Sequence, residues 1–205
     1  MDESATIHVI DDDASLRAAL DSLFRSTGLA TRLYESASAF LETPPPNAAG
    51  CIVVDVRMPG LSGLDFQQRL GEAGIALPVI VMTGHGDIPM SVKAMKAGAV
   101  DFLPKPFRDQ EMLDAVAAAL ARDAERRDGQ GKLESLQAAF ATLSPRERQV
   151  MGLVAAGKMN KQVAGDLGLS EITVKIHRGA AMRKMGARTL ADLVRMAEAL
   201  GVGPG

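Results

Sequence analysis

Four short apolar runs, each followed by a polar residue, constrain the fold of this chain most strongly. They cover residues 7–10 before Asp11, 51–54 before Asp55, 78–82 before Thr83 and 99–103 before Lys105. Helical patterns separate these runs, and a weaker run at residues 31–34 supplies one more strand. Runs rich in Val and Ile that alternate with helices are typical of a parallel sheet covered on both faces. The sequence therefore predicts five β-α units.

Helix starts are predicted where short polar side chains can accept hydrogen bonds from free backbone N–H groups. Four such residues precede helical patterns in the N-terminal half: Asp13, Ser36, Ser62 and Asp109. For Asp13, capping is favoured over a direct part in a functional site. The single cysteine, Cys51, lies inside an apolar run and is predicted to be a buried small hydrophobic residue.

The polar residues at the strand ends are expected to lie close together, because ligands of open parallel sheets bind beyond the carboxyl ends of the strands. Clustered carboxylates are tolerable when a divalent cation neutralises them, and a site made only of oxygen ligands favours Mg²⁺. The residues that would share this pocket are Asp11, Asp12, Asp55, Thr83 and Lys105.

This set of groups is suited to holding a phosphoryl group on Asp55. Taken singly, an Asp after a strand is most often a cap or a turn former, so the convergence is what favours this chemistry. Mg²⁺ would offset charge, Lys105 would pair with one phosphoryl oxygen, and Thr83 would donate a hydrogen bond to another. A Mg²⁺-dependent phosphohydrolase with Asp55 as nucleophile is the alternative, although the pattern offers no evident general acid beside Asp55.

The two halves of the chain carry opposite charge. Residues 1–124 hold 10 Lys and Arg against 17 Asp and Glu, whereas residues 125–205 hold 13 basic against 8 acidic side chains. A charged segment, residues 124–139, lies between them and is expected to prolong the preceding helix until Gly129 and Gly131 weaken it. A separate basic domain with a polyanionic partner is therefore predicted.

The C-terminal half has the pattern of a small helical domain. Ser144, Pro145 and Glu147 form a capping-box sequence at the start of a helix. Residues 161–168 and 171–187 follow as two helices around a Gly-containing turn, which is the helix-turn-helix plan. Further caps are predicted at Ser170 and Thr189.

The second helix of this pair has an outward face that water alone does not explain. A helical wheel turns Val174, Ala181 and Met185 inward. A DNA major groove could cover the opposite face, because an apolar side chain can touch a thymine methyl and a Lys can reach a base edge or a phosphate. A helical bundle with a solvated basic face stays open as the simpler interpretation. The outward residues are Ile172, Ile176, Gly179 and Arg183, flanked by Lys175.

Several blocks of the N-terminal half resemble, in order, the receiver domain of two-component response regulators over about residues 4–123. They are VIDDD, VVDVRMPGLSGLDF, VIVMTGHGD and KAGAVDFLPKPF. The resemblance implies a flavodoxin-like, doubly wound sheet of five parallel strands. It also implies that a sensor histidine kinase phosphorylates Asp55. The Mg²⁺ ligands that it implies are Asp12, Asp55, the Arg57 carbonyl and, often through water, Asp11.

The same resemblance implies how the signal leaves the site. Thr83 and Phe102 would act as a switch pair, and Lys105 would contact the phosphoryl group from a cis peptide with Pro106. The signal would reach the face formed by residues 88–98 and the last strand, which often becomes a dimer interface in this family. The apolar residues Ile88, Val92 and Met95 of that segment are equally compatible with packing into the sheet.

Residues 143–194 resemble the LuxR-type helix-turn-helix domain over its whole length. This all-α domain of four helices would follow the receiver. The resemblance implies DNA contacts by four residues of the recognition helix, Thr173, Lys175, Ile176 and Gly179, with Lys161 toward the DNA backbone. Arg178 is also included, although the helical wheel places it near the buried edge.

Together the two resemblances indicate a response regulator of the FixJ/NarL class. The expected domains are a receiver at residues 1–123, a helical or flexible linker at 124–139 and a DNA-binding domain at 140–205. Phosphorylation would switch on dimerisation and DNA binding in a transcription activator that is otherwise a monomer. A ligand-sensing LuxR-type regulator is a further alternative, but it requires a small-molecule pocket in the N-terminal half.

Further expectations about partners and location follow from the same class. The partners would be a FixL-like kinase, promoter DNA and RNA polymerase, and the targets nitrogen-fixation genes controlled by oxygen. The chain would not be an enzyme beyond its own Mg²⁺-dependent phosphotransfer and dephosphorylation. No run approaches the roughly 18 apolar residues of a membrane span, and the acidic start MDESAT differs from a signal peptide, so a cytoplasmic location is expected.

Overall fold

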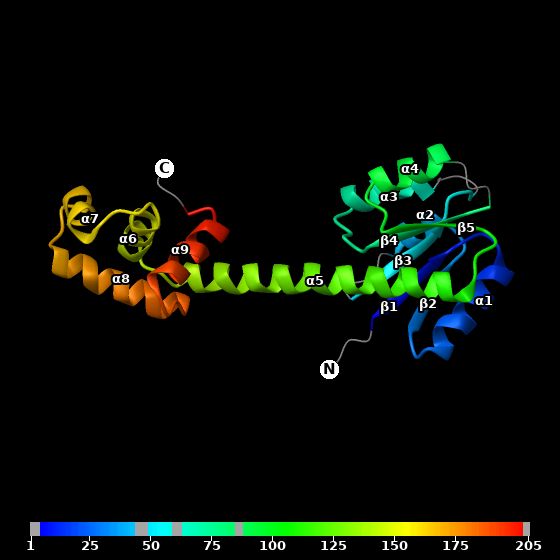
Figure 1. The fold of residues 1–205 in the computed structure, drawn as a ribbon, viewed down its shortest axis with the longest axis horizontal. Coiled ribbons are helices and arrows are strands. Elements are labelled where there is room, and N and C mark those ends of the chain that lie inside the picture. Colours follow the sequence, from blue (N-terminus) through cyan, green and yellow to red (C-terminus); the bar gives the residue numbers. More distant parts are fainter. Residues whose placement is uncertain (1–4, 44–48, 59–62, 85–87, 203–205) are drawn as a thin grey trace. The chain divides into compact units, whose positions relative to one another are not determined.

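The computed structural model describes residues 5–43, 49–58, 63–84 and 88–202, and the chain divides into two compact units (Figure 1). The first is Met1–Arg126 and the second is Arg127–Gly205. The first unit is an α/β domain and the second consists of helices. The predicted order of fold classes along the chain is therefore confirmed.

The described residues of the first unit form one sheet of five parallel strands in the order β2-β1-β3-β4-β5. Every position of the central strand β3 is buried, whereas the edge strands β2 and β5 are partly exposed. This is the expected burial for a sheet covered on both faces. The strands are β1 (Thr6–Ile10), β2 (Ala30–Tyr34), β3 (Gly50–Asp55), β4 (Val79–Thr83) and β5 (Asp101–Pro104).

Helices cover both faces of this sheet, and each face has its own apolar core. On one face, Phe24 of α1 and Met112 of α5 pack against β1 and its neighbours. On the other face, Phe40 of α2 and Phe66 of α3 meet edge to face with ring centroids 5.5 Å apart. The helices of this unit are α1 (Ala14–Ser26), α2 (Ala37–Glu42), α3 (Gly63–Glu72), α4 (Ile88–Lys96) and the start of α5 (Asp109–Ala141).

Two of the four predicted helix caps in this unit are confirmed. The Asp13 carboxylate accepts from the N–H groups of Ser15 and Leu16, and Ser36 caps α2. Ser62 lies outside the described residues. The predicted helix start at Asp109 is confirmed, because α5 begins there, but Asp109 is the first helical residue rather than the cap. The Glu111 carboxylate accepts from the N–H of Arg108, the residue before the helix, at 2.8 Å. Cys51 is buried as predicted, and burial, with the nearby charge of Asp123, raises the pKa of its thiol to about 12.

Helix α5 continues through Gly129 and Gly131 to Ala141, where the sequence predicts a weakening. Each glycine costs up to about 1 kcal/mol against Ala. Pairs four residues apart offset part of this cost, since Lys132 contacts Asp128 and Gln130 donates to Glu134. Although α5 is long, none of the helices in the described segments is apolar enough to span a membrane.

The second unit combines the end of α5 with four further helices that enclose two small cores. Val174 joins one core, and Ala181 and Met185 join the other, so the predicted inward face of α8 is confirmed. The capping box between Ser144 and Glu147 is present, as are the caps at the starts of α8 and α9. The helices are α6 (Pro145–Ala155), α7 (Asn160–Leu167), α8 (Glu171–Met185) and α9 (Leu190–Ala199).

The side chain of Asp123 ties α5 to the first residue of β3. Asp123 is buried, and its Oδ2 accepts from the N–H of Gly50 at 3.1 Å while Arg126 pairs with Oδ1 at 2.7 Å. A Cβ at Gly50 would lie 2.1 Å from the carbonyl oxygen of Thr6, which a real side chain cannot do. Only glycine therefore fits at this position.

We expect Gly50→Ala to lower the free energy of unfolding of the receiver unit by at least about 2 kcal/mol, because the strands must separate to admit the methyl group. Gly71→Ala in α3 is the matched control, since a Cβ there has no neighbour within 4 Å. It should leave stability unchanged or raise it by up to about 1 kcal/mol. Urea unfolding followed by fluorescence of Tyr34, the only Tyr in a chain without Trp, measures this unit. Equal effects of the two substitutions would contradict the packing argument.

Candidate functional site

Three strands of the receiver sheet deliver charged side chains to one place at its carboxyl edge. Asp11 follows β1, Asp55 ends β3, and Lys105 follows β5. The Lys105 Nζ lies 2.7 Å from Asp11 Oδ2 and 2.6 Å from Asp55 Oδ2, so one ammonium group bridges two carboxylates. The predicted convergence of these three residues is present in the structure.

The bridge is largely removed from water. Asp11 is fully buried and Asp55 is 7% exposed. Burial by itself would lower the pKa of Lys105, but hydrogen bonds to Asp11 and Asp55 and their negative charges outweigh it and raise this pKa above its usual value. Lys105 is therefore a permanent cation at neutral pH. The peptide between Lys105 and Pro106 is cis, as the family resemblance implies.

Backbone N–H groups fix the orientation of both carboxylates. Asp11 Oδ1 accepts from the N–H of Asp13, and Asp55 Oδ1 accepts from the N–H of Arg57, each at 2.9 Å. Arg17 of α1 adds a hydrogen bond of 2.6 Å to the carbonyl oxygen of Asp11. In the sequence, only the position of Arg17 one turn after Asp13 hints at this role. It holds the turn that carries the acidic residues.

The acidic side chains have a donor set suited to a hard divalent cation. Asp11, Asp12 and Asp55 each offer a carboxylate oxygen, and these atoms lie within 4.8 Å of one another. Asp12 is exposed and Asp55 lies beside it, so an ion could enter from solvent. Oxygen ligands alone suit Mg²⁺. The residues present therefore fit the predicted cation, with the Arg57 backbone positioned two residues after Asp55.

The two predicted switch residues occupy different environments. Thr83 is fully buried at the end of β4, and its carbonyl oxygen accepts from the N–H of Lys105 at 2.6 Å. Phe102 on β5 is half-buried against the core beneath α2, α3 and α4. On α4, Val92 and Met95 are 44% and 48% exposed, so they do not pack into the sheet. The side chain of Ile88 lies outside the described part of the chain.

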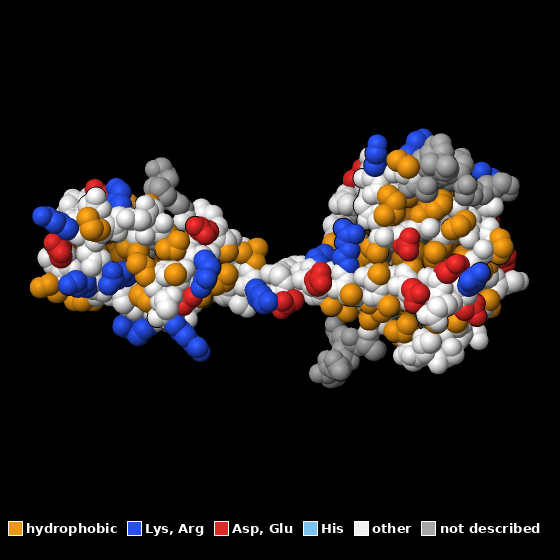
Figure 2. Space-filling model, viewed as in Figure 1, with side chains coloured by type: hydrophobic (Ala, Val, Ile, Leu, Met, Phe, Trp, Pro, Cys, Tyr) orange, Lys and Arg blue, Asp and Glu red, His pale blue; other side chains and the backbone are white. Residues whose placement is uncertain are grey.

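Helix α8 carries the predicted nucleic-acid face of the second unit. Ile172 and Ile176 are 72% and 63% exposed, which is unusual for such apolar side chains on a helix. Lys175 is exposed beside them, Thr173 and Gly179 are partly exposed, and Lys161 lies exposed on α7. Figure 2 shows Lys and Arg side chains projecting along the edge of this unit where Figure 1 places α8, with hydrophobic side chains at the same edge.

Arg178 has a structural partner that the helical wheel does not reveal. Its Nη1 donates to Asn160 Oδ1 at 3.1 Å, which links α8 to the first residue of α7. A side chain held in this way is half-buried, in agreement with its position near the inward edge. Arg178 thus fixes the angle between the two helices of the helix-turn-helix, whatever else it contacts.

Comparison with known proteins agrees with both halves of this description. A family model described as the response regulator receiver domain matches residues 7–117, which is more than half of the chain. A second model, described as bacterial regulatory proteins of the luxR family, matches residues 141–197. The chain is a response regulator. Its receiver and LuxR-type DNA-binding domain place it in the FixJ/NarL class of transcription regulators, which act with a kinase and bind DNA.

Full-length relatives support this assignment. The chain is 58% identical to nodulation protein W of Bradyrhizobium diazoefficiens, an alignment that covers 97% of the chain and 87% of that protein. It is 48% identical to the transcriptional regulatory protein FixJ of Azorhizobium caulinodans, with 100% and 97% covered. The solved structure of response regulator StyR matches with a TM-score of 0.83 and 47% identity, covering 95% and 98%. Because relatives with different names are this similar, the comparison assigns the class rather than one named member.

We expect removal of the bridging ammonium to destabilise the receiver. Lys105→Met leaves Asp11 and Asp55 buried side by side without a counter-ion, which should cost about 2 kcal/mol at neutral pH. Adding Asp11→Asn to the same variant should recover most of the loss, because the repulsion needs both carboxylates. Urea unfolding at neutral pH, followed by Tyr34 fluorescence, measures it. Lys96→Met, at an exposed position of α4, is the control; a loss that is the same with and without Asp11→Asn would contradict this explanation.

Proposed function

We propose that this response regulator is phosphorylated on Asp55 by a sensor histidine kinase and that the modification switches DNA binding. The observation that carries the proposal is the bridge from Lys105 to Asp11 and Asp55 beside the exposed Asp12. A single buried carboxylate would be inert. Here the carboxylate of Asp55 faces an ammonium group and a donor set for Mg²⁺, which are the groups that stabilise an incoming phosphoryl group.

The proposed chemistry needs little more than positioning. An oxygen of Asp55 attacks the phosphorus of a kinase phosphohistidine, the P–N bond breaks, and the electron pair leaves with the imidazole, which takes up a proton. Lys105 then exchanges its bond with Asp55 for one with a phosphoryl oxygen, and the Thr83 hydroxyl donates to another. Bound Mg²⁺, held by Asp11, Asp12, Asp55 and the Arg57 carbonyl, would offset the charge of the transferred group.

We propose that this site modifies only its own chain. Phosphotransfer to Asp55 and slow hydrolysis of the acyl phosphate would be its only reactions, so the protein is not a general phosphohydrolase. Among the described residues, the donors to the Asp55 carboxylate are the Lys105 ammonium and the Arg57 backbone N–H. Both stabilise negative charge on the carboxylate, and neither is suited to deliver and recover a proton at neutral pH. This favours a stable phosphorylated state over turnover of added substrates.

The switch would run from Thr83 and Phe102 to the α4–β5 face. Val92 and Met95 expose apolar surface there, which suits a dimer interface that forms on phosphorylation while the unmodified chain stays a monomer. Dimerisation would couple two weak DNA-binding domains and raise their affinity for a two-site operator through effective concentration. We propose that the dimer activates transcription by RNA polymerase in the cytoplasm, where its DNA target lies.

The DNA contacts that we propose come from α7 and α8. Ile176 would touch a thymine methyl, Gly179 would permit close approach, and Thr173 and Lys175 would reach base edges or phosphates. Lys161 would contact the DNA backbone. Arg178, which is bonded to Asn160, would contact DNA only at the edge of this surface. The proposed residues are Lys161, Thr173, Lys175, Ile176, Arg178 and Gly179.

The kinase and the target genes follow from resemblance alone. Similarity to FixJ favours a FixL-like kinase and nitrogen-fixation genes under the control of oxygen. The higher identity to nodulation protein W favours nodulation genes as a second candidate. Phosphotransfer from a purified FixL-like kinase to the chain, measured with ATP under oxygen and without it, tests the kinase assignment.

We expect acetyl phosphate and Mg²⁺ to add the mass of one phosphoryl group to the native chain and none to Asp55→Asn. Asp12→Asn should slow the reaction at least about tenfold, because one ligand of the cation loses its charge. Asp13→Asn is the matched control, since Asp13 caps α1 and Asn preserves that cap. Intact-protein mass spectrometry over time gives the rates. Modification of Asp55→Asn at the native rate would refute the assignment.

We expect Lys175→Gln to weaken binding of the phosphorylated protein to double-stranded DNA about tenfold and to reduce the salt slope of log affinity by about one. Without this phosphate contact, DNA binding releases one counterion fewer, and the slope falls accordingly. Fluorescence anisotropy between about 50 and 200 mM salt measures both quantities. Lys132→Gln on α5 is the charge-matched control. A native slope in Lys175→Gln would show that this Lys does not contact a phosphate.

A further inference from the structure

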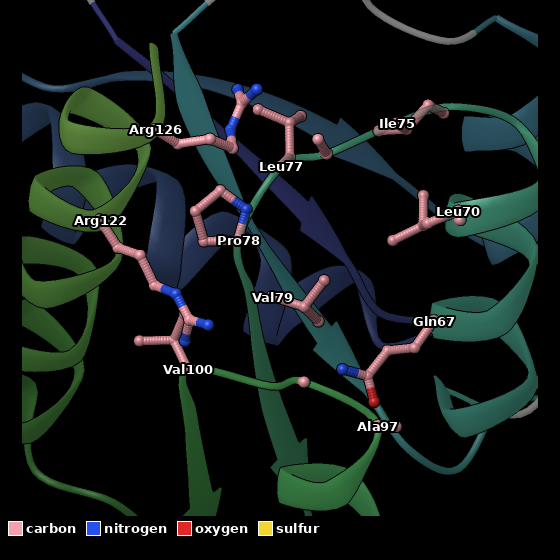
Figure 3. A pocket seen from close by; sticks show the side chains of 13 residues that line it. Gln67, Leu70, Ile75, Leu77, Pro78, Val79, Ala97, Val100, Arg122 and Arg126 are labelled. Carbon is pink, nitrogen blue, oxygen red and sulfur yellow. The ribbon is translucent and has the colours of Figure 1, made fainter. Parts of the chain in front are cut away.

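A second concave site lies in the receiver, at the edge of the sheet opposite to Asp55. It is a cavity of about 420 Å³ bordered by α3, the segment that enters β4, the connection from α4 to β5, and α5 (Figure 3). Its wall includes Val79, the first residue of β4, whereas Thr83 ends that strand at the phosphorylation site. At about 3.3 Å per residue, these two ends of β4 lie about 13 Å apart. The cavity is therefore separate from the acidic cluster, and its volume is within the range of small-molecule sites.

One wall of the cavity carries a polar atom without a partner. Gln67 of α3 is only 9% exposed, and its Oε1 has no hydrogen-bond partner among the described residues. An acceptor buried in this way costs about 1 to 3 kcal/mol, and such groups are rare in folded proteins. Figure 3 shows the Gln67 amide directed from α3 into the space between Val79 and Ala97. A molecule that binds here would gain a hydrogen bond by donating to this oxygen.

The facing wall carries positive charge from α5. Arg122 and Arg126 are four residues apart, so they share one side of the helix. Arg126 pairs with the buried Asp123, but Arg122 has no hydrogen bond or ion pair with any residue in the described ranges. In Figure 3 its guanidinium enters beside Val100, across the cavity from Gln67. A guanidinium presented in this way can bind a carboxylate through two parallel hydrogen bonds.

We propose that this cavity binds a small apolar carboxylic acid that also carries a hydroxyl or N–H group. Its carboxylate would pair with Arg122 and its donor group would satisfy Gln67 Oε1, while its apolar body would lie against Leu70, Leu77 and Val100. An ordered water could satisfy Gln67, but it would leave the apolar walls wet. A ligand at this site would contact α5 of the receiver, and its binding would not depend on phosphorylation of Asp55.

We test this with 4-hydroxybenzoate and 3-hydroxybenzoate, which hold both polar groups at fixed separations on a rigid ring. Titration into the full chain, observed through methyl NMR signals, should shift the signals of Leu70, Leu77, Val79 and Val100 in a saturable way. For ligands of this size we expect a Kd of about 1 mM or tighter for at least one isomer. The same shifts should occur in Asp55→Asn, which separates this site from the phosphorylation site.

Matched ligands and variants assign the two contacts. Benzoate lacks the donor and should bind about fivefold more weakly than the preferred isomer, a difference that disappears in Gln67→Leu. The corresponding hydroxybenzamide lacks the charge and should also bind about fivefold more weakly, a difference that disappears in Arg122→Gln. Arg108→Gln, at the exposed residue before α5 and outside the cavity lining, is the charge-matched control and should retain native binding. The effect of the ligand hydroxyl should disappear only in Gln67→Leu, and the effect of the ligand charge should disappear only in Arg122→Gln. Each comparison is a double-mutant cycle between a protein group and a ligand group.

Three outcomes would overturn the proposal. The first is the absence of saturable shifts with either isomer at a ligand concentration about tenfold above the expected Kd of about 1 mM. The second is equal binding of all four probes to the native chain, which would show that apolar contact alone directs them. The third is binding that survives in both Gln67→Leu and Arg122→Gln with unchanged preferences. Gln67→Leu also removes a buried acceptor and should not unfold the receiver, so a negative result remains interpretable.

Discussion

A single ammonium group that bridges two buried carboxylates is the interaction on which the functional end of this molecule depends. Asp11 and Lys105 are 94 residues apart in the sequence, with Asp55 between them, and only the order of the strands in the sheet brings the three together. Two buried carboxylates repel each other strongly out of water, and the Lys105 ammonium between them offsets this repulsion. The strand ends and the turn held by Arg17 both position the groups of this bridge.

Much of this arrangement is predictable from the sequence because local patterns and topology point the same way. Short Val- and Ile-rich runs fix a parallel sheet, and the carboxyl ends of its strands must share an edge. The identities of Asp11, Asp55, Thr83 and Lys105 then follow from the residue that ends each run. The face of α8 is equally predictable, because Val174, Ala181 and Met185 repeat with the period of a helix.

Other features depend on contacts that the sequence does not display. The continuation of α5 through Gly129 and Gly131 relies on side-chain pairs around the glycines, which a propensity scale does not include. Asp109 is the first residue of α5 rather than its cap, and the carboxylate of Glu111 accepts from the N–H of the preceding residue, Arg108. The bond from Arg178 to Asn160 and the unpartnered oxygen of Gln67 join residues from different elements, so only coordinates reveal them.

The bond between Asp123 and the N–H of Gly50 also decides where this protein can be divided. The receiver family model ends at residue 117, six residues before the carboxylate that closes the amino edge of the sheet. A fragment cut at the family boundary would lack both Asp123 and Arg126, so the N–H of Gly50 would lose its acceptor. The compact unit extends to Arg126, beyond the boundary of the family model, and a fragment that ends there keeps this contact.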